Sequence, residues 1–241
     1  MRLLNILILT LFSASPALSQ TALDWLTMLD RQMFYRSAEY TAKMIIHTPG
    51  GSERVFTMAG KVVGEKYALM EFLDPPRQKG TRYLKRDDNL WIYFPRQDRT
   101  MQIQGHMLRQ GVEGGDLSFE DMTESSSLLE NYTPKLVGST DSTVTILLES
   151  HDMTVSYPYR EITLDMRNAI PLRIINSGAN KTPIKEIITL KTQRFGDRIY
   201  PVVTEIRSLL VEDKWTRFDI VEMKFDVEIP EETFTKEVLV K

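Results

Sequence analysis

Three histidines, His47, His106 and His151, are the first candidates for chemistry, because imidazole can bind a metal ion or take up a proton near neutral pH. No two of them stand at a spacing typical of metal ligands. The loop around His106 also carries four acidic residues: Glu113, Asp116, Glu120 and Asp121. These groups could form a weak metal or acid–base site. A solvated acidic loop with a surface histidine explains them more simply, and we favour that interpretation.

Other catalytic motifs are incomplete. Residues 125–127 are serines without the Gly-x-Ser-x-Gly sequence of a nucleophile elbow. The glycines at 111, 114 and 115 lack the Lys-Ser/Thr pair of a phosphate-binding loop. The chain has no cysteine, which excludes thiol catalysis and thiolate metal sites. The sequence therefore predicts a protein that is not an enzyme and that uses no metal or cofactor.

Positive charge gathers around the middle of the first half of the chain, in a cluster made of Lys79, Arg82, Arg86, Arg96 and Arg99. A solvated face explains such a cluster, and so would contact with lipid phosphates or an acidic partner. The net charge of the whole chain is only −3, so no nucleic-acid footprint is expected.

The first 19 of the 241 residues have the pattern of a secretory signal peptide. Arg2 gives the positive start, residues 3–12 are apolar, and Ala17-Leu18-Ser19 is a small-x-small cleavage site before Gln20. No cysteine follows the site, so no lipid attachment is expected, and no later run approaches ~20 apolar residues. We expect residues 20–241 to form one exported, periplasmic domain.

One helix is predicted, over residues 21–37. Thr21 and Asp24 can form a capping box at its start. Leu26, Leu29 and Met33 follow helical spacing, so the helix should pack one face on a sheet.

The rest of the chain reads mainly as strands joined by short turns, which predicts antiparallel neighbours. The expected strands are residues 40–46, 55–63, 67–73, 81–84, 90–94, 100–103, 133–137, 144–150, 159–165, 171–177, 185–195, 200–210 and 215–227. A sheet of about a dozen strands tends to curl. The predicted fold class is therefore α+β, with a strongly curved antiparallel sheet that forms an open, incomplete β-barrel. In the last strand, alternation places Val221, Met223 and Phe225 on one face.

Residues 105–132 interrupt the strands with glycines and two expected helical turns, at residues 117–122 and 126–130. Asp116 is placed to cap the first turn. A glycine-hinged apolar segment suits a lid over the sheet. An ordinary helical crossover between two groups of strands fits the same residues, and both interpretations stay open.

Three motifs resemble outer-membrane lipoprotein-sorting proteins, the LolA-like carriers, in particular their branch associated with RND-type exporters. They are residues 75–81 (Pro-Pro-Arg-Gln-Lys-Gly-Thr), 90–95 (Leu-Trp-Ile-Tyr-Phe-Pro) and 114–122 (Gly-Gly-Asp-Leu-Ser-Phe-Glu-Asp-Met). The chain has Gly115 where serine is usual and Phe119 where tyrosine is usual. Residues 230–234 also look like the end of the family's sequence.

The resemblance implies an open β-barrel with a helical lid that holds acyl chains of a lipid or lipoprotein. It also implies transient partners, an RND-type inner-membrane permease and an outer-membrane acceptor, and we expect a monomer. Two alternative functions are considered. One is a periplasmic sensor of the same fold, although such sensors usually have a second domain. The other is an exported hydrolase, although the sequence contains no recognisable pair of nucleophile and base.

The predicted groove uses one face of the strands between residues 69 and 103, although which parity faces inward is left open. Its candidate lining residues are Leu69, Phe72, Leu84, Leu90, Ile92, Phe94, Met101 and Ile103. The candidate lid residues are Met107, Leu108, Phe119 and Met122. The many methionines suit an adaptable groove, and equally an ordinary core.

Overall fold

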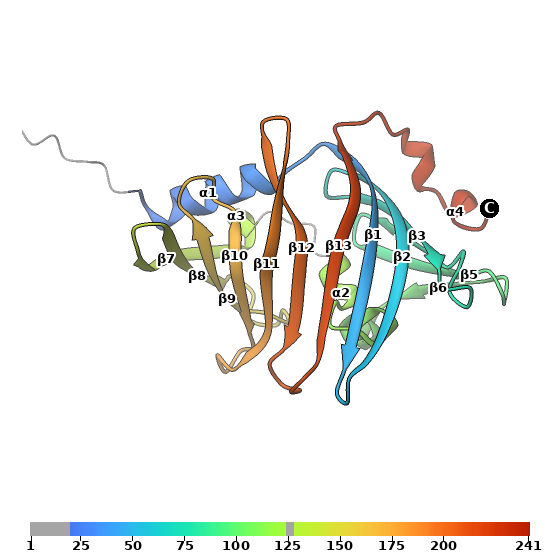
Figure 1. Ribbon diagram of the computed structural model, residues 1–241, viewed down its shortest axis with the longest axis horizontal. Coiled ribbons are helices and arrows are strands. Elements are labelled where there is room, and N and C mark those ends of the chain that lie inside the picture. The colour runs from blue at the N-terminus through green and yellow to red at the C-terminus, as the bar shows by residue number, and fades with distance from the viewer. Residues whose placement is uncertain (1–19, 124–127) are drawn as a thin grey trace, which may run out of the picture.

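A computed structural model describes residues 20–123 and 128–241. The predicted signal peptide and the serines at 125–127 lie outside the described residues. A single antiparallel sheet contains all 13 of the described strands, in the order β6-β5-β4-β3-β2-β1-β13-β12-β11-β10-β9-β8-β7 (Figure 1). The two ends of this order are edge strands, so the sheet is open, and the predicted fold class is confirmed.

The sheet consists of two meanders that meet where β1 pairs with β13. The first contains β1 (Ser37–Thr48), β2 (Ser52–Val63), β3 (Tyr67–Asp74), β4 (Arg82–Arg86), β5 (Asn89–Phe94) and β6 (Arg99–Ile103). The second contains β7 (Tyr132–Ser139), β8 (Thr143–Ser150), β9 (Tyr159–Asp165), β10 (Pro171–Ser177), β11 (Pro183–Phe195), β12 (Arg198–Ser208) and β13 (Trp215–Phe225). Alternation and turn residues fix strands locally, which is why the predicted and observed bounds agree within a few residues.

The connection from β6 to β7 joins the two opposite edges of the sheet, so it must cross one of its faces. We call residues 104–131 the crossover segment. Its helical pieces are η1 (Gly105–Arg109), η2 (Val112–Gly114), α2 (Phe119–Thr123) and α3 (Leu128–Asn131). The expected helical crossover is thus present, while motion of the segment as a lid remains a prediction.

Helix α1 (Ala22–Met33) begins with the predicted capping box. The Thr21 hydroxyl accepts from the Asp24 amide at 3.2 Å, and the Asp24 carboxylate accepts from the Thr21 amide at 2.8 Å. The helix ends earlier than predicted, because Phe34 is already extended and Ser37 starts β1. Pairing of β1 with both β2 and β13 therefore overrides helical continuation through residue 37.

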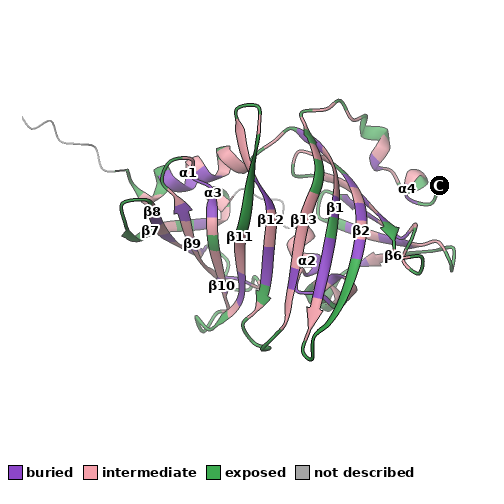
Figure 2. Ribbon diagram, in the orientation of Figure 1, coloured by how far each residue is buried: buried purple, intermediate pink, exposed green. Residues whose placement is uncertain are grey.

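Two apolar clusters lie on the same, concave side of the sheet, the side that α1 and α2 cover (Figure 1). Figure 2 marks the buried residues of the strands and helices in purple. In the crossover cluster, η1, η2 and α2 pack on β1–β6 around Phe56, Phe72 and Ile92. In the helix cluster, α1 and α3 pack on β7–β10 around Leu26 and Ile146. Strands β12 and β13 lie between these two regions in the sheet.

A third apolar cluster covers the outer face of β3–β5. Phe234 and Leu239, from η3 (Glu231–Phe234) and α4 (Lys236–Leu239), are fully buried there against Leu84. Within residues 20–123 and 128–241, no helix has the length and apolarity needed to cross a membrane.

Candidate functional site

A cavity of about 930 Å³ lies between the crossover cluster and the helix cluster. The central strands form its wall, while the end of α1 and parts of the crossover segment border it. Its apolar lining residues include Leu29, Met33, Phe34, Ala42, Met58, Val62, Ala68, Met70, Leu117, Met122, Leu128, Leu129, Ile162, Ile174, Phe218, Ile220 and Met223. The lining is therefore dominated by aliphatic, methionine and phenylalanine side chains, which suit a flexible apolar ligand.

The wall at β13 owes its shape to a β-bulge. Pairing between β1 and β13 passes from Thr41–Glu222 to Ala42–Ile220, which leaves Val221 without an opposite residue. A bulge reverses the alternation of side chains beyond it. Phe218 and Ile220 line the cavity before the bulge and Met223 lines it after, while Val221 is 58% exposed. The predicted common face of Val221 and Met223 is thus wrong.

Aromatic residues narrow the end of the cavity near the α1–β1 junction. Tyr35, Tyr40 and Tyr200 all line it. Burial raises the pKa of the Tyr40 and Tyr200 hydroxyls well above the ordinary range, so both stay neutral. The ring of Tyr40 lies over Gly60, where a Cβ atom would collide with it. A glycine at position 60 therefore makes room for this ring at the cavity wall.

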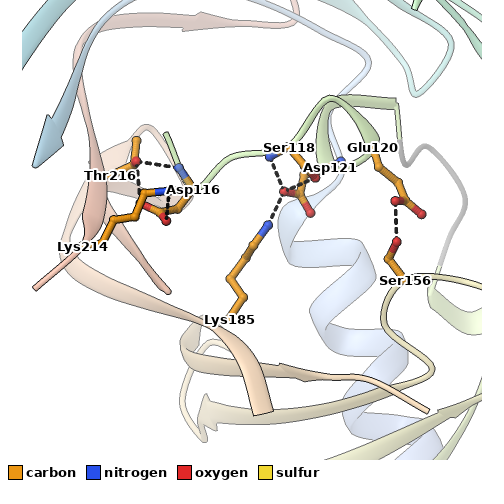
Figure 3. Close-up of polar contacts among 8 residues, drawn as sticks. All are labelled: Asp116, Ser118, Glu120, Asp121, Ser156, Lys185, Lys214 and Thr216. Carbon is orange, nitrogen blue, oxygen red and sulfur yellow. Dashed lines mark hydrogen bonds and ion pairs between the residues drawn. The ribbon is translucent and has the colours of Figure 1, made fainter. Parts of the chain in front are cut away.

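Polar contacts hold the crossover segment against the sheet (Figure 3). Asp116 is bound to β13: its amide donates to the Thr216 hydroxyl at 2.8 Å, and that hydroxyl donates to the Asp116 carboxylate at 2.9 Å. Lys214 Nζ lies 3.4 Å from the same carboxylate. Asp116 thus anchors the segment and does not cap α2 as predicted.

A second anchor involves Ser118, the residue that caps the start of α2, and its partner Asp121. The Ser118 hydroxyl accepts from the Asp121 amide at 3.2 Å, and the Asp121 carboxylate accepts from the Ser118 amide at 2.7 Å. The same carboxylate lies 2.5 Å from Lys185 Nζ on β11. Burial lowers the pKa of Lys185, but the nearby Asp121 carboxylate and Tyr157 hydroxyl outweigh it and leave the pKa raised. Lys185 therefore stays protonated throughout the neutral range.

Two further contacts extend this anchoring along the segment. Arg54 on β2 donates to the Glu113 carbonyl oxygen at 2.8 Å. The Ser156 hydroxyl donates to the Glu120 carboxylate at 2.5 Å (Figure 3). The crossover segment is thus tied to β2, β11, β13 and the β8–β9 loop, on both sides of the cavity.

Solved structures of other proteins share the fold of this chain. An outer membrane lipoprotein-sorting protein domain from Vibrio parahaemolyticus has a TM-score of 0.79 and 18% identity, covering 91% of this chain and 98% of the other. A DUF1329 family protein from Desulfovibrio piger reaches 0.82 with 17% identity, over 90% and 97%. A LolA superfamily protein from Nitrosomonas europaea reaches 0.76 with 18% identity, over 91% and 100%.

A protein-family model whose description reads "-like: Uncharacterized protein" matches residues 64–241, which is more than half of the chain. The chain belongs to the family that this model describes, and it has the LolA-like fold. The LolA-like fold that the resemblance in the three motifs implied is thereby confirmed. No curated protein matches the sequence significantly. At identities of 17–18%, the solved structures establish the fold of this LolA-like chain.

Most of the predicted groove residues lie on the concave side, but in the crossover cluster beside the cavity. Phe72, Leu90, Ile92, Ile103 and Phe119 are buried in that cluster, and Phe94, Met101, Met107 and Leu108 pack against it. Of the predicted residues, Met122 lines the cavity itself. These side chains fill the space between the sheet and the crossover segment, so they border a solid core at that end.

Two predicted groove residues face the other way. Leu69 and Leu84 pack with Phe234 on the outer face of the sheet, and their inward assignment is corrected. The sequence left strand parity open, and both faces of β3–β5 are apolar because the C-terminal helices cover the outer one. Period-two alternation therefore cannot distinguish the two faces here.

The cavity is lined by strands that the sequence-based groove omitted. Tyr40, Ala42, Met58, Phe218 and Ile220 line it from β1, β2 and β13. The alternation of residues 40–46 and 55–63 marks an inward face on β1 and β2. The residues of β13 that pair with β1 lie 168 to 187 positions later in the chain, so this pairing gives no local signal.

The histidines lie outside the cavity lining. His47 stacks on Trp215 and lies 3.0 Å from the Asp213 carboxylate, His106 is exposed, and His151 lies 3.1 Å from the Thr133 hydroxyl. Among residues 20–123 and 128–241, no group of three His, Asp or Glu side chains is arranged to hold a metal ion.

The predicted basic cluster is partly engaged in local contacts. Arg82 lies 3.0 Å from the Glu71 carboxylate, Arg86 lies 4.0 Å from Glu231, and Arg96 donates to the Pro76 carbonyl oxygen at 3.1 Å. These contacts favour the interpretation of a solvated face over that of a lipid-phosphate site.

Proposed function

We propose that this LolA-like chain is a carrier that binds the acyl chains of a lipid or lipoprotein in the cavity between its two apolar clusters. The observation that carries the proposal is the cavity itself: about 930 Å³, lined mainly by apolar side chains on the concave side of an open sheet. Its volume lies near the upper end of the roughly 300–1,000 Å³ range of small-molecule sites.

Retention of the ligand is the activity that this site supports. Burial of apolar surface contributes about 25 cal/mol per Å², so an acyl chain can be held without a charged or catalytic group. Methionines at 33, 58, 70, 122 and 223 line the cavity, and their unbranched side chains can adjust to chains of different length. The crossover segment would shield the bound chain from water.

The setting that we propose for this carrier is the periplasm, reached through removal of residues 1–19. There it would receive its ligand from an inner-membrane exporter of the RND type and deliver it to an outer-membrane acceptor. Resemblance in the three sequence motifs to the exporter-associated branch supports this setting. The chain would act as a monomer, because one chain contains the whole cavity.

Neighbouring residues of β13 provide a matched pair of variants that test the proposal. Ile220 lines the cavity, whereas Val221 is 58% exposed at the bulge. Ile220→Glu places a carboxylate among apolar side chains, where an unpaired charge costs several kcal/mol, so binding of a fluorescent fatty-acid probe should weaken by about 100-fold or more. Val221→Glu should leave probe binding unchanged.

Thermal unfolding of both variants controls for damage to the fold. A folded Ile220→Glu protein that binds the probe as tightly as the wild type would contradict the proposed carrier site. Equal loss of binding in the two variants would point to a general effect of negative charge and would also count against the cavity.

A further inference from the structure

Three tyrosines from different parts of the chain meet at one end of the apolar cavity. Tyr35 precedes β1, Tyr40 lies on β1 and Tyr200 lies on β12, and all three line the cavity. Burial raises the pKa of each hydroxyl, and the proximity of Tyr35 raises the pKa of Tyr40 and Tyr200 further. The three hydroxyl groups, which we call the tyrosine cluster, are therefore neutral throughout the neutral pH range.

Packing fixes the rings of the tyrosine cluster. The rings of Tyr35 and Tyr200 both pack on Phe225, with centroids 5.5 and 5.2 Å from the centroid of its ring. The ring of Tyr40 is held over Gly60, where a Cβ atom would lie 2.2 Å from the ring. The fold itself thus positions the cluster, as is usual for polar groups in a small-molecule site.

The Tyr40 hydroxyl differs from the other two in its partners. The hydroxyl groups of Tyr35 and Tyr200 are hydrogen-bonded to each other. Within residues 20–123 and 128–241, no protein group forms a hydrogen bond with the Tyr40 hydroxyl. A polar group withdrawn from water usually has a hydrogen-bond partner, and a tyrosine hydroxyl has one O–H to donate. The partner that this position lacks is therefore an acceptor on a molecule inside the cavity.

We propose that the Tyr40 hydroxyl donates a hydrogen bond to the carbonyl oxygen of an acyl ester, while the acyl chain occupies the apolar remainder of the cavity. An ester carbonyl stands at the head of its acyl chain and is a neutral acceptor, so it suits a neutral donor at one end of an apolar cavity. This inference rests on the proposed carrier function and specifies the chemical class of its ligand as ester-linked acyl chains.

Two ligands of matched length separate this hydrogen bond from apolar burial. Methyl myristate has an ester carbonyl and hexadecane has none, and both can be titrated by displacement of a fluorescent acyl probe from the full mature chain. Tyr40→Phe keeps the ring and removes only the hydroxyl. It should weaken the binding of methyl myristate by about two- to tenfold, the effect of one neutral hydrogen bond, and leave the binding of hexadecane unchanged.

Infrared spectroscopy of the bound ester reports the bond itself, because a carbonyl stretch moves to lower frequency when its oxygen accepts a hydrogen bond. Methyl myristate bound to the wild type should absorb at a lower frequency than it does in dry hydrocarbon. Tyr40→Phe should return the band toward the hydrocarbon value. A band at the hydrocarbon value in the wild type, or the same lowered band in Tyr40→Phe, would overturn the assignment of Tyr40.

Tyr93→Phe is the matched control. The Tyr93 hydroxyl donates to the Asp98 carboxylate at 3.0 Å, and Tyr93 packs with Phe234 on the outer face of the sheet. This variant should leave both affinities and the infrared band unchanged. Retained binding of hexadecane by Tyr40→Phe reports an intact cavity, so a folding defect cannot imitate the expected result.

The remaining outcomes separate the sources of failure. Absence of binding of both ligands to the wild type would overturn the carrier function and this inference together. Binding of both ligands to the wild type, with an equal change or no change in Tyr40→Phe, would overturn only this inference. A loss of ester affinity in Tyr93→Phe as large as that in Tyr40→Phe would also overturn it.

Discussion

At the scale of single residues, the Lys185–Asp121 ion pair joins β11 to the start of α2. The side chains of its two members are only 8% and 15% exposed, and the Ser118 amide and hydroxyl also bind the carboxylate. Removal of one member of such a pair leaves a charge buried without its partner. The pair therefore matters for the position of the crossover segment as well as for stability.

We predict that Lys185→Met lowers the free energy of unfolding by about 3 kcal/mol, because Asp121 keeps its buried charge. The double variant Lys185→Met/Asp121→Asn should lose less than the single variant, since it removes both charges. Urea denaturation measures all three proteins. A double variant that is less stable than Lys185→Met would show that the charges are not coupled in this way.

The same pair predicts a dependence on pH. The pKa of Lys185 is raised above its ordinary value of 10.5, so the folded state holds this proton more tightly than the unfolded chain does. The stability that it contributes should be constant below pH 10.5 and be lost as the pH rises through the raised pKa. The difference in urea midpoint between wild type and Lys185→Met should therefore shrink above pH 10.5. A difference that already shrinks between pH 6 and 9 would contradict the assignment.

At the scale of elements, the crossover segment depends on β13 through Thr216, which is fully buried. Thr216→Val keeps the shape of the side chain but removes the hydroxyl that binds both the amide and the carboxylate of Asp116. Loss of a buried hydrogen bond to a charged group is worth about 1.5–3 kcal/mol.

We therefore predict that amides of residues 111–118 exchange with solvent about tenfold faster or more in Thr216→Val, as measured by hydrogen–deuterium exchange with mass spectrometry. Strands β8 and β9, which lie in the helix cluster, serve as the internal reference and should be unchanged. Uniformly faster exchange over the whole chain would mean global destabilisation and would contradict a local anchor.

The sequence predicts well where the strands begin and end. It predicts less well which face of the sheet a side chain occupies and which distant residue it contacts. Strands such as β9 and β10 agree with the predicted bounds, because Gly, Pro and Asn turns mark their ends. The bulge at Val221 and the outward direction of Leu84 were missed, since the first depends on pairing with β1 and the second on cover by Phe234. The sequence predicts a helix cap at Asp116 because the true partner, Thr216, is 100 residues away.

At the scale of the whole molecule, the order of the strands explains why a cavity exists. Because β6 and β7 are opposite edges, the crossover segment spans the concave side and packs mainly on β1–β6, while α1 packs on β7–β10. The cavity lies between these two regions, against β12 and β13. The central place of the cavity therefore follows from long-range topology, which local sequence patterns do not contain.

The central claim is that this LolA-like chain holds an amphiphile in its cavity, and native mass spectrometry of the protein purified from the periplasm tests it most directly. We predict a chain that begins at Gln20 and carries one acyl-containing molecule, which is released on collisional activation and is missing from Ile220→Glu but retained by Val221→Glu. A bare chain with no acyl-containing molecule, or the same adduct on Ile220→Glu as on the wild type, would contradict the claim.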